Sequence, residues 1–210
     1  MRVIKDAAER KQEILDVAER LFSTKGYDDT STNDILKEIG IARGTLYYHF
    51  QSKEEILDAM IERMGNQLIA KAREVAQNKE VPVLQRVIMT IMSMHVDDEL
   101  TQEVLQQVHK PQNALMHQKM QESMIKGICP ILAGIVKEGI EQGVCNTEYP
   151  DEAVEMMMIY ANTAFDDEMN YSPDERERKI SGFVYHIERI FGLEEGCMMK
   201  LMLPLFQTPE

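Results

Sequence analysis

The chain has 210 residues, of which 44% are hydrophobic, and its formal net charge at pH 7 is −13. This length and apolar content predict a folded protein of one or two domains and exclude a disordered chain. The three cysteines include no C-x-x-C pair, which argues against a disulfide framework and a zinc knuckle, so we expect no metal site and no other cofactor.

No segment is expected to enter a membrane or to direct export. The first fifteen residues lack the apolar stretch of a secretory signal. The longest nearly apolar run, residues 128–136, is too short to cross a bilayer. We therefore expect a cytoplasmic protein without a membrane partner.

The acidic charge is unevenly distributed along the chain. Residues 1–53 carry nine Lys or Arg and nine Asp or Glu, so the whole excess of negative charge comes from residues 54–210. A neutral N-terminal part can present a basic surface locally, whereas the acidic remainder is repelled by phosphate.

Apolar residues recur at helical spacing almost throughout, and no alternating run bounded by turns predicts a strand. We expect an all-α fold of about nine helices, with a kink or break at Pro130 and no assignment for the tail after residue 192. The expected helices cover residues 7–24, 32–39, 43–49, 53–77, 82–98, 99–108, 113–142, 150–169 and 173–191.

Residues 31–50, STNDILKEIGIARGTLYYHF, have the pattern of a helix-turn-helix, in which a short support helix and a tight turn precede a helix that enters the major groove. The buried positions are expected to be Ile35, Leu36, Ile39, Ile41, Leu46 and Phe50. The second helix then exposes a polar and aromatic face suited to phosphates and base edges. The alternative for either Tyr47 or Tyr48 is packing inward against the first helix.

The segment GTLYYHFQSKEEIL, which follows a Gly-Tyr-x-x-Thr-Ser lead-in, resembles the tetracycline-repressor (TetR) family of bacterial regulators over residues 7–60. The resemblance implies an N-terminal three-helix DNA-binding domain over residues 1–53, with the helix-turn-helix motif at 31–50. It also implies a helical ligand-binding and dimerisation domain over residues 54–210. Beyond residue 60 the similarity is one of overall plan only.

The resemblance further implies roles for individual residues. It assigns contacts with double-stranded DNA to Thr32, Arg43, Gly44, Thr45, Tyr47, Tyr48, His49 and Lys53. Arg43 is expected to reach a base edge or a phosphate, and Gly44 to let the helix backbone approach the DNA. Thr32 and Lys53 are expected to bind phosphates, whereas Ala42 has no hydroxyl and receives no such role.

The C-terminal part offers candidates for a small-molecule effector site, because Met side chains line adaptable apolar pockets. The candidate residues are Met89, Met92, His95, Met116, Met120, Met124, Met157 and Tyr160. The effector itself is not identified by the sequence. The alternative for the Met stripes is ordinary core packing.

Helices over about 151–169 and 173–191 carry apolar residues on more than one side, and in the family these helices pair in a homodimer. A dimer on a palindromic operator would supply the affinity that one seven-residue reading helix lacks. We expect a repressor that leaves its operator when an effector moves the helix over 53–77.

Rival functions remain to be weighed against this one. An all-α enzyme is disfavoured because no metalloprotease, nucleophile-elbow, phosphate-loop or dinucleotide motif is present. A helical protein-docking module and a ligand-independent regulator stay open. Steep salt dependence would distinguish DNA binding from protein docking, because it reports counterions released from phosphate.

Overall fold

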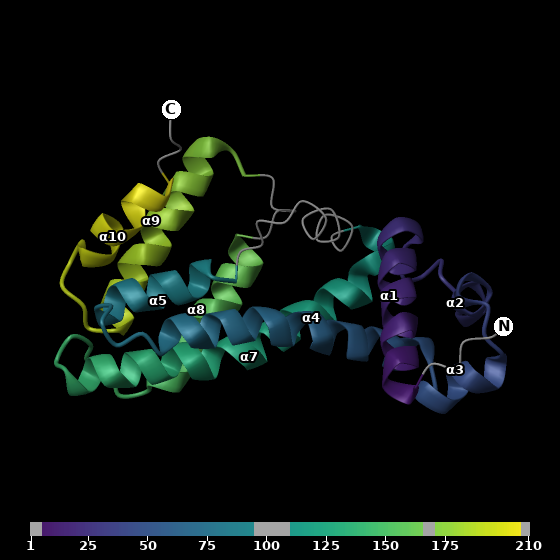
Figure 1. Cartoon of the computed structure of the whole chain (residues 1–210). Helices are drawn as coiled ribbons and strands as arrows, with labels where there is room; N and C mark the ends of the chain where they lie inside the picture. The colour runs from purple at the N-terminus through teal and green to yellow at the C-terminus, as the bar shows by residue number, and fades with distance from the viewer. Residues whose placement is uncertain (1–5, 95–109, 166–170, 207–210) are drawn as a thin grey trace. The chain divides into compact units, whose positions relative to one another are not determined.

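A computed structural model describes residues 6–94, 110–165 and 171–206, with side chains up to residue 202 (Figure 1). This part of the chain contains nine α-helices, one 3-10 turn and no strand, which confirms the expected all-α fold. The elements are α1 (Ala7–Lys25), α2 (Thr32–Ile39), α3 (Arg43–His49), α4 (Lys53–Ala76), α5 (Val83–Met92), η1 (Pro111–Asn113), α7 (Ala114–Glu141), α8 (Pro150–Ala164), α9 (Pro173–Ile190) and α10 (Cys197–Phe206). The helix expected over 99–108 lies outside the described residues.

Local capping signals explain where the first helices begin and end. Asp6 and Glu9 form a capping box at the start of α1, and Ser31 and Asp34 form another at the start of α2. Gly40 ends α2 in the left-handed conformation, with φ of 72°, where a side chain would be strained. These signals lie within a few residues of each boundary, so the sequence could predict them.

The break or kink considered at Pro130 does not end the helix, because α7 runs through this residue to Glu141. A proline inside a helix removes one backbone hydrogen bond and crowds the preceding turn. Ile128 and Leu132, on either side of Pro130, are fully buried. We infer that burial of these neighbours offsets the local cost and keeps the helix continuous.

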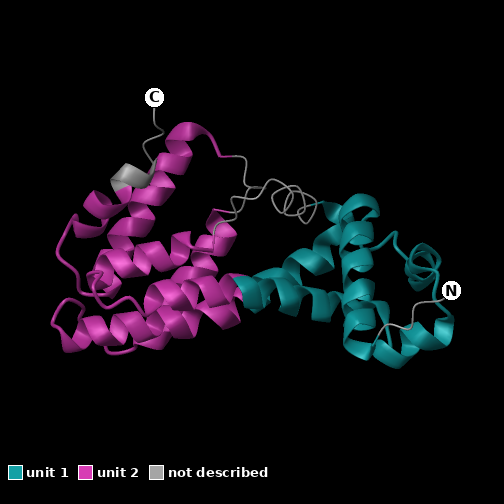
Figure 2. Cartoon of the chain, viewed as in Figure 1, with its two compact units in different colours: residues 1–67, 96–123 teal, residues 68–95, 124–210 magenta. Residues whose placement is uncertain are grey.

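Contacts divide the chain into two compact units (Figure 2). The first unit comprises residues 1–67 and 96–123, and the second comprises 68–95 and 124–210. Two helices, α4 and α7, therefore contribute residues to both units. This grouping by contacts differs from the boundary expected after residue 53, because the first half of α4 and the start of α7 pack with the N-terminal helices. The functional boundary stays a prediction.

The core of the first unit joins the helix-turn-helix to its supporting helices. Its buried members are Ile14, Leu15, Ala18, Phe22, Tyr27, Ile35, Leu46, Phe50, Ile56, Leu57, Met60, Ile61 and Met116. Leu36, Ile39 and Ile41 pack against this core while remaining partly exposed. All six apolar positions expected for the helix-turn-helix thus belong to one cluster, which sets the polar face of α3 outward.

The second unit has its own core, formed by residues of α4, α5, α7, α8, α9 and α10. An ion pair in this unit joins α5 to α7. The Arg86 side chain is only 1% exposed, and its Nη2 lies 2.7 Å from Oε1 of Glu138, whose side chain is 19% exposed. Lys79 also pairs with Glu138. Within the described ranges, no helix combines the length and apolar content that crossing a membrane requires.

Candidate nucleic-acid interface

Helix α3 is short and anchored by two apolar side chains. Leu46 and Phe50 are buried, and the helix starts at Arg43 without a side-chain cap. Tyr48 is 75% exposed, and its ring meets the His49 ring edge-on with 5.0 Å between centroids. Tyr47 and His49 are half-buried, so neither tyrosine is packed inside the first unit.

Polar contacts connect α3 to the start of α2. The Arg43 guanidinium carbon lies 5.5 Å from the centroid of the Tyr47 ring. Hydrogen bonds from Arg43 and from Thr32 lower the pKa of the Tyr47 hydroxyl, because both stabilise its oxygen. Three of the residues expected to contact DNA are therefore brought together, with Gly44 exposed beside them.

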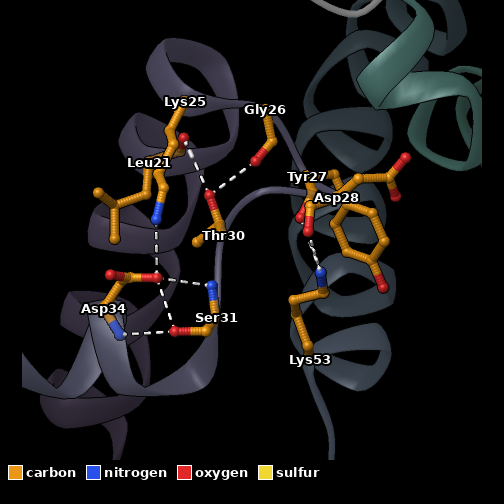
Figure 3. Close-up of polar contacts among 9 residues, drawn as sticks. All are labelled: Leu21, Lys25, Gly26, Tyr27, Asp28, Thr30, Ser31, Asp34 and Lys53. Atoms are coloured by element: carbon orange, nitrogen blue, oxygen red, sulfur yellow. Dashed lines mark hydrogen bonds and ion pairs between the residues drawn. The ribbon is translucent and has the colours of Figure 1, made fainter.

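The loop between α1 and α2 leads directly into the helix-turn-helix, and a buried hydroxyl shapes it. Thr30 Oγ1 donates to the carbonyl of Gly26 at 2.7 Å, and the Leu21 carbonyl lies 3.4 Å from the same oxygen (Figure 3). Gly26 itself has φ of 95°, a conformation that favours glycine. These contacts therefore hold the loop close to the end of α1.

The start of α2 is held by a small polar network around one carboxylate. Asp34 Oδ2 accepts hydrogen bonds from the Ser31 backbone N–H at 2.8 Å, from Ser31 Oγ at 2.6 Å and from Lys25 Nζ at 2.9 Å (Figure 3). The Ser31 hydroxyl is the largest cause that lowers the pKa of Asp34, followed by the Ser31 amide and Lys25. This network fixes the position at which α2, and with it Thr32, begins.

Lys53, expected to bind a phosphate, contacts the α1–α2 loop in this structure. Its Nζ donates to the Tyr27 carbonyl at 2.7 Å, lies 3.4 Å from the Asp28 carbonyl and stands 4.1 Å from the centroid of the Tyr27 ring (Figure 3). The lysine thereby ties the start of α4 to the loop. Its phosphate contact stays a prediction.

Several residues that shape this surface are not among the expected DNA contacts. Ser31 and Asp34 carry a visible signal, because Ser-x-x-Asp before an apolar helix is a capping pattern. Asn113 has no such signal in the sequence around it. Its Oδ1 accepts the backbone N–H of Tyr27 at 2.6 Å, although the two residues are 86 positions apart.

The second unit contains an apolar cavity of about 690 Å³. Its walls come from α5, α7, α8, α9, α10 and nearby loops, and none of the described residues that line it is charged. Met92 and Met157, both expected at an effector site, line this cavity. A second cavity of about 460 Å³ on α8 and α9 is lined by Met157, Tyr160 and several other residues, including Arg178 and His186.

The other candidates for the effector site lie elsewhere. Met116 is fully buried in the core of the first unit, and Met120 packs against that core. The Met stripe on α7 is thus divided between the two units, because Met116 and Met120 belong to the first and Met124 belongs to the second. Their role at an effector site stays a prediction. Met89 and Met124 line neither of the two cavities described, and His95 lies outside the described residues.

Comparisons with known proteins agree with this architecture. Residues 14–60 match the family of bacterial regulatory proteins called the tetR family, and residues 85–184 match the tetracyclin repressor-like C-terminal domain. The fatty acid metabolism regulator protein of Bacillus subtilis is 30% identical over 142 residues, which cover 67% of this chain and 73% of that protein.

The chain belongs to the TetR family. It is a transcriptional regulator that binds DNA, as the family resemblance over residues 7–60 predicted. The HTH-type negative transcriptional regulator of the biofilm operon icaADBC in Staphylococcus epidermidis is 46% identical over 59 residues, which cover 28% of this chain and 32% of that protein. The solved structure of Salmonella enterica GusR, at 17% identity, has a TM-score of 0.61 over 90% of this chain and 98% of its own. That likeness shows the shared fold.

Proposed function

We propose that this TetR-family protein is a dimeric repressor that leaves its operator when an apolar small molecule enters the second unit. The observation that carries the proposal is the outward face of α3, where Arg43 and Thr32 converge on Tyr47 and Tyr48 is 75% exposed. The residues proposed to contact DNA are Thr32, Arg43, Gly44, Thr45, Tyr47, Tyr48, His49 and Lys53. Contacts between Arg43 and Tyr47 support this because they order α3 before DNA arrives.

Exposed apolar side chains support dimerisation through α8 and α9. Met156, Ile159 and Tyr160 on α8, and Tyr185 and Ile190 on α9, are between 39% and 64% exposed. Two packed helices with such a surface are typical of a protein interface. A second copy with the same face would cover it, and a two-fold axis would present two α3 helices to a palindrome.

The apolar cavity of about 690 Å³ supports an effector with a hydrocarbon body. This volume is within the range of small-molecule sites, about 300–1,000 Å³. None of the described lining residues could pair with a charge, so the carboxylate of a fatty acid would have to stay at the mouth of the cavity while its hydrocarbon chain fills the interior. The Bacillus subtilis relative is named a fatty acid metabolism regulator, so fatty acids are the first ligands to test.

DNA binding is tested with fragments selected by the protein from the genomic DNA of its own organism. We expect the affinity of the wild-type protein for a selected operator to fall about 10³-fold or more between 50 and 200 mM salt, as for roughly six or more phosphate contacts. Arg43→Ala should weaken operator binding by about 1–3 kcal/mol for each half-site, because it removes a base contact. Fluorescence anisotropy measures both effects.

Arg73→Ala is the matched control, since it removes an equal charge from an exposed position of the second unit. It should bind like the wild type. If no fragment is selected, or if binding does not depend on salt, the protein-docking alternative replaces the proposed function.

Effector class is tested with saturated fatty acids of ten to eighteen carbons. Each added methylene should strengthen binding by about 0.8 kcal/mol, or roughly fourfold, until the chain fills the cavity. Dicarboxylic acids of equal length are the matched ligands, and they should bind more weakly because one carboxylate would be buried among apolar groups. Calorimetry measures binding of the fatty acid to the protein, and the loss of labelled operator from the complex measures release from DNA. Binding without operator release would favour a ligand-independent regulator.

A further inference from the structure

Hydrogen bonds from two other segments hold the loop between α1 and α2 at Tyr27. The Tyr27 N–H donates to Asn113 Oδ1 at 2.6 Å, and its C=O accepts from Lys53 Nζ at 2.7 Å. The Asp28 N–H donates to the carbonyl of Gln112 at 3.1 Å. Backbone groups of this loop are therefore bonded to the start of α4 and to the 3-10 turn that opens α7.

The contact with the start of α7 is close and buried. Asn113 is 1% exposed, and its neighbour Met116 is fully buried in the core of the first unit. A Cβ built at Gly26 would overlap the side chain of Gln112, so the loop can approach this turn only with glycine there. Burial makes the Asn113 hydrogen bond costly to lose, because an unpaired buried N–H costs about 1–3 kcal/mol.

An ion pair fastens the same part of α7 to α4. Lys119 Nζ lies 2.7 Å from Asp58 Oδ1 and 3.0 Å from Glu54 Oε1. Hydrogen bonds to these two carboxylates raise the pKa of Lys119 to about 12, because they stabilise its charged form. Residues 112–119 thus contact both the α1–α2 loop and the helix that follows α3.

Few residues separate Tyr27 from the face of α3 that is proposed to contact DNA. Ser31 caps α2 four positions after Tyr27, and Thr32 hydrogen-bonds with Tyr47 of α3. At its other end α7 supplies Leu132 and Val136 to the wall of the apolar cavity. Helix α7 therefore runs without a break from Ala114, the residue that follows Asn113, to the cavity wall.

We propose that Asn113 is a positioning residue for operator recognition, through which α7 provides a second connection to the reading helix besides α4. This inference rests on the proposed function. Asn113 acts through Tyr27 and the start of α2 and does not contact DNA. Its loss should reduce operator affinity while leaving the phosphate contacts of non-specific binding in place.

The test compares Asn113→Ala with the wild-type protein at one salt concentration. We expect operator binding to weaken about tenfold, binding to non-specific DNA to stay within twofold, and the Tyr27 and Asp28 amides to exchange faster with deuterium. Asn113→Asp keeps an acceptor oxygen for the Tyr27 N–H but places a carboxylate at a position that is 1% exposed, so it should recover only part of the lost operator affinity. Asn113→Ser is a milder truncation, to be used if the alanine variant does not fold. Gln118→Ala, at an exposed position of α7, is the matched control.

The proposal is overturned if Asn113→Ala exchanges faster at Tyr27 yet binds the operator within twofold of the wild-type affinity. It is also overturned if operator and non-specific DNA lose affinity equally, because that result indicates only a damaged fold. Absence of operator binding by the wild-type protein would contradict the proposed function itself. This result would be known before any variant is compared.

Discussion

Ile159→Asp is expected to convert the protein into a folded monomer with at least about 100-fold weaker operator binding. Ile159 is 47% exposed on α8, so a charge there costs the isolated subunit little. In a two-fold interface each substitution appears twice, and like charges opposed across an interface cost several kcal/mol. A loss of about 2.7 kcal/mol corresponds to the 100-fold change in affinity.

Sedimentation velocity at micromolar concentration measures the change in mass, and circular dichroism checks the helical content. Gln118→Asp is the matched control, because it adds the same charge at an exposed position of α7. It should remain dimeric and bind the operator as the wild type does. A dimeric Ile159→Asp variant would show that the exposed face of α8 and α9 is not the interface.

Glu138→Ala is expected to lower the free energy of unfolding of the second unit by about 3 kcal/mol, because breaking a buried ion pair leaves its partner charge uncompensated. The Arg86 side chain is 1% exposed, and its Nε and Nη1 atoms have no hydrogen-bond partner within the described part of the chain. Glu138 is therefore the carboxylate that compensates this buried charge. Urea denaturation followed by circular dichroism measures the loss.

The control for this variant is Lys79→Ala. Lys79 also pairs with Glu138, but its side chain is 66% exposed, so its removal should cost less than about 1 kcal/mol. Equal losses for the two variants would contradict the assigned role of Arg86.

The same ion pair predicts a pH dependence. Hydrogen bonds from Arg86, and then from Lys79, lower the pKa of Glu138 below its usual value of 4.5. A carboxylate with a depressed pKa in the folded state stabilises the protein fully above its unfolded pKa. That stabilisation is lost as the pH falls below about 4.5 through the folded value. The difference in stability between the wild type and Glu138→Gln should therefore narrow on acidification.

The sequence predicted the elements that short-range signals determine. Its helices over 32–39 and 43–49 agree with α2 and α3, because Ser31 caps the first helix and Gly40 ends it within a short segment. Apolar spacing also predicted which side of α3 faces inward, since Leu46 and Phe50 are buried and Tyr48 is exposed. The family followed from the same segment, because its motif is long and contiguous.

Other features depend on which segments meet in three dimensions, and periodicity along one helix does not contain that information. The Met stripe on α7 was visible, but only the tertiary structure placed Met116 in the first unit and the cavity in the second. The sequence predicted a phosphate contact for Lys53, but only the tertiary structure placed the Tyr27 carbonyl within hydrogen-bond distance of its Nζ. By itself, then, the sequence determined the reading motif, the family and the described helices before the tail, because their signals are local, whereas α10 lies in the tail that the sequence left unassigned. Tertiary packing alone decided the cavity, the buried Arg86 ion pair and the Asn113 contact, because each joins residues far apart in the chain.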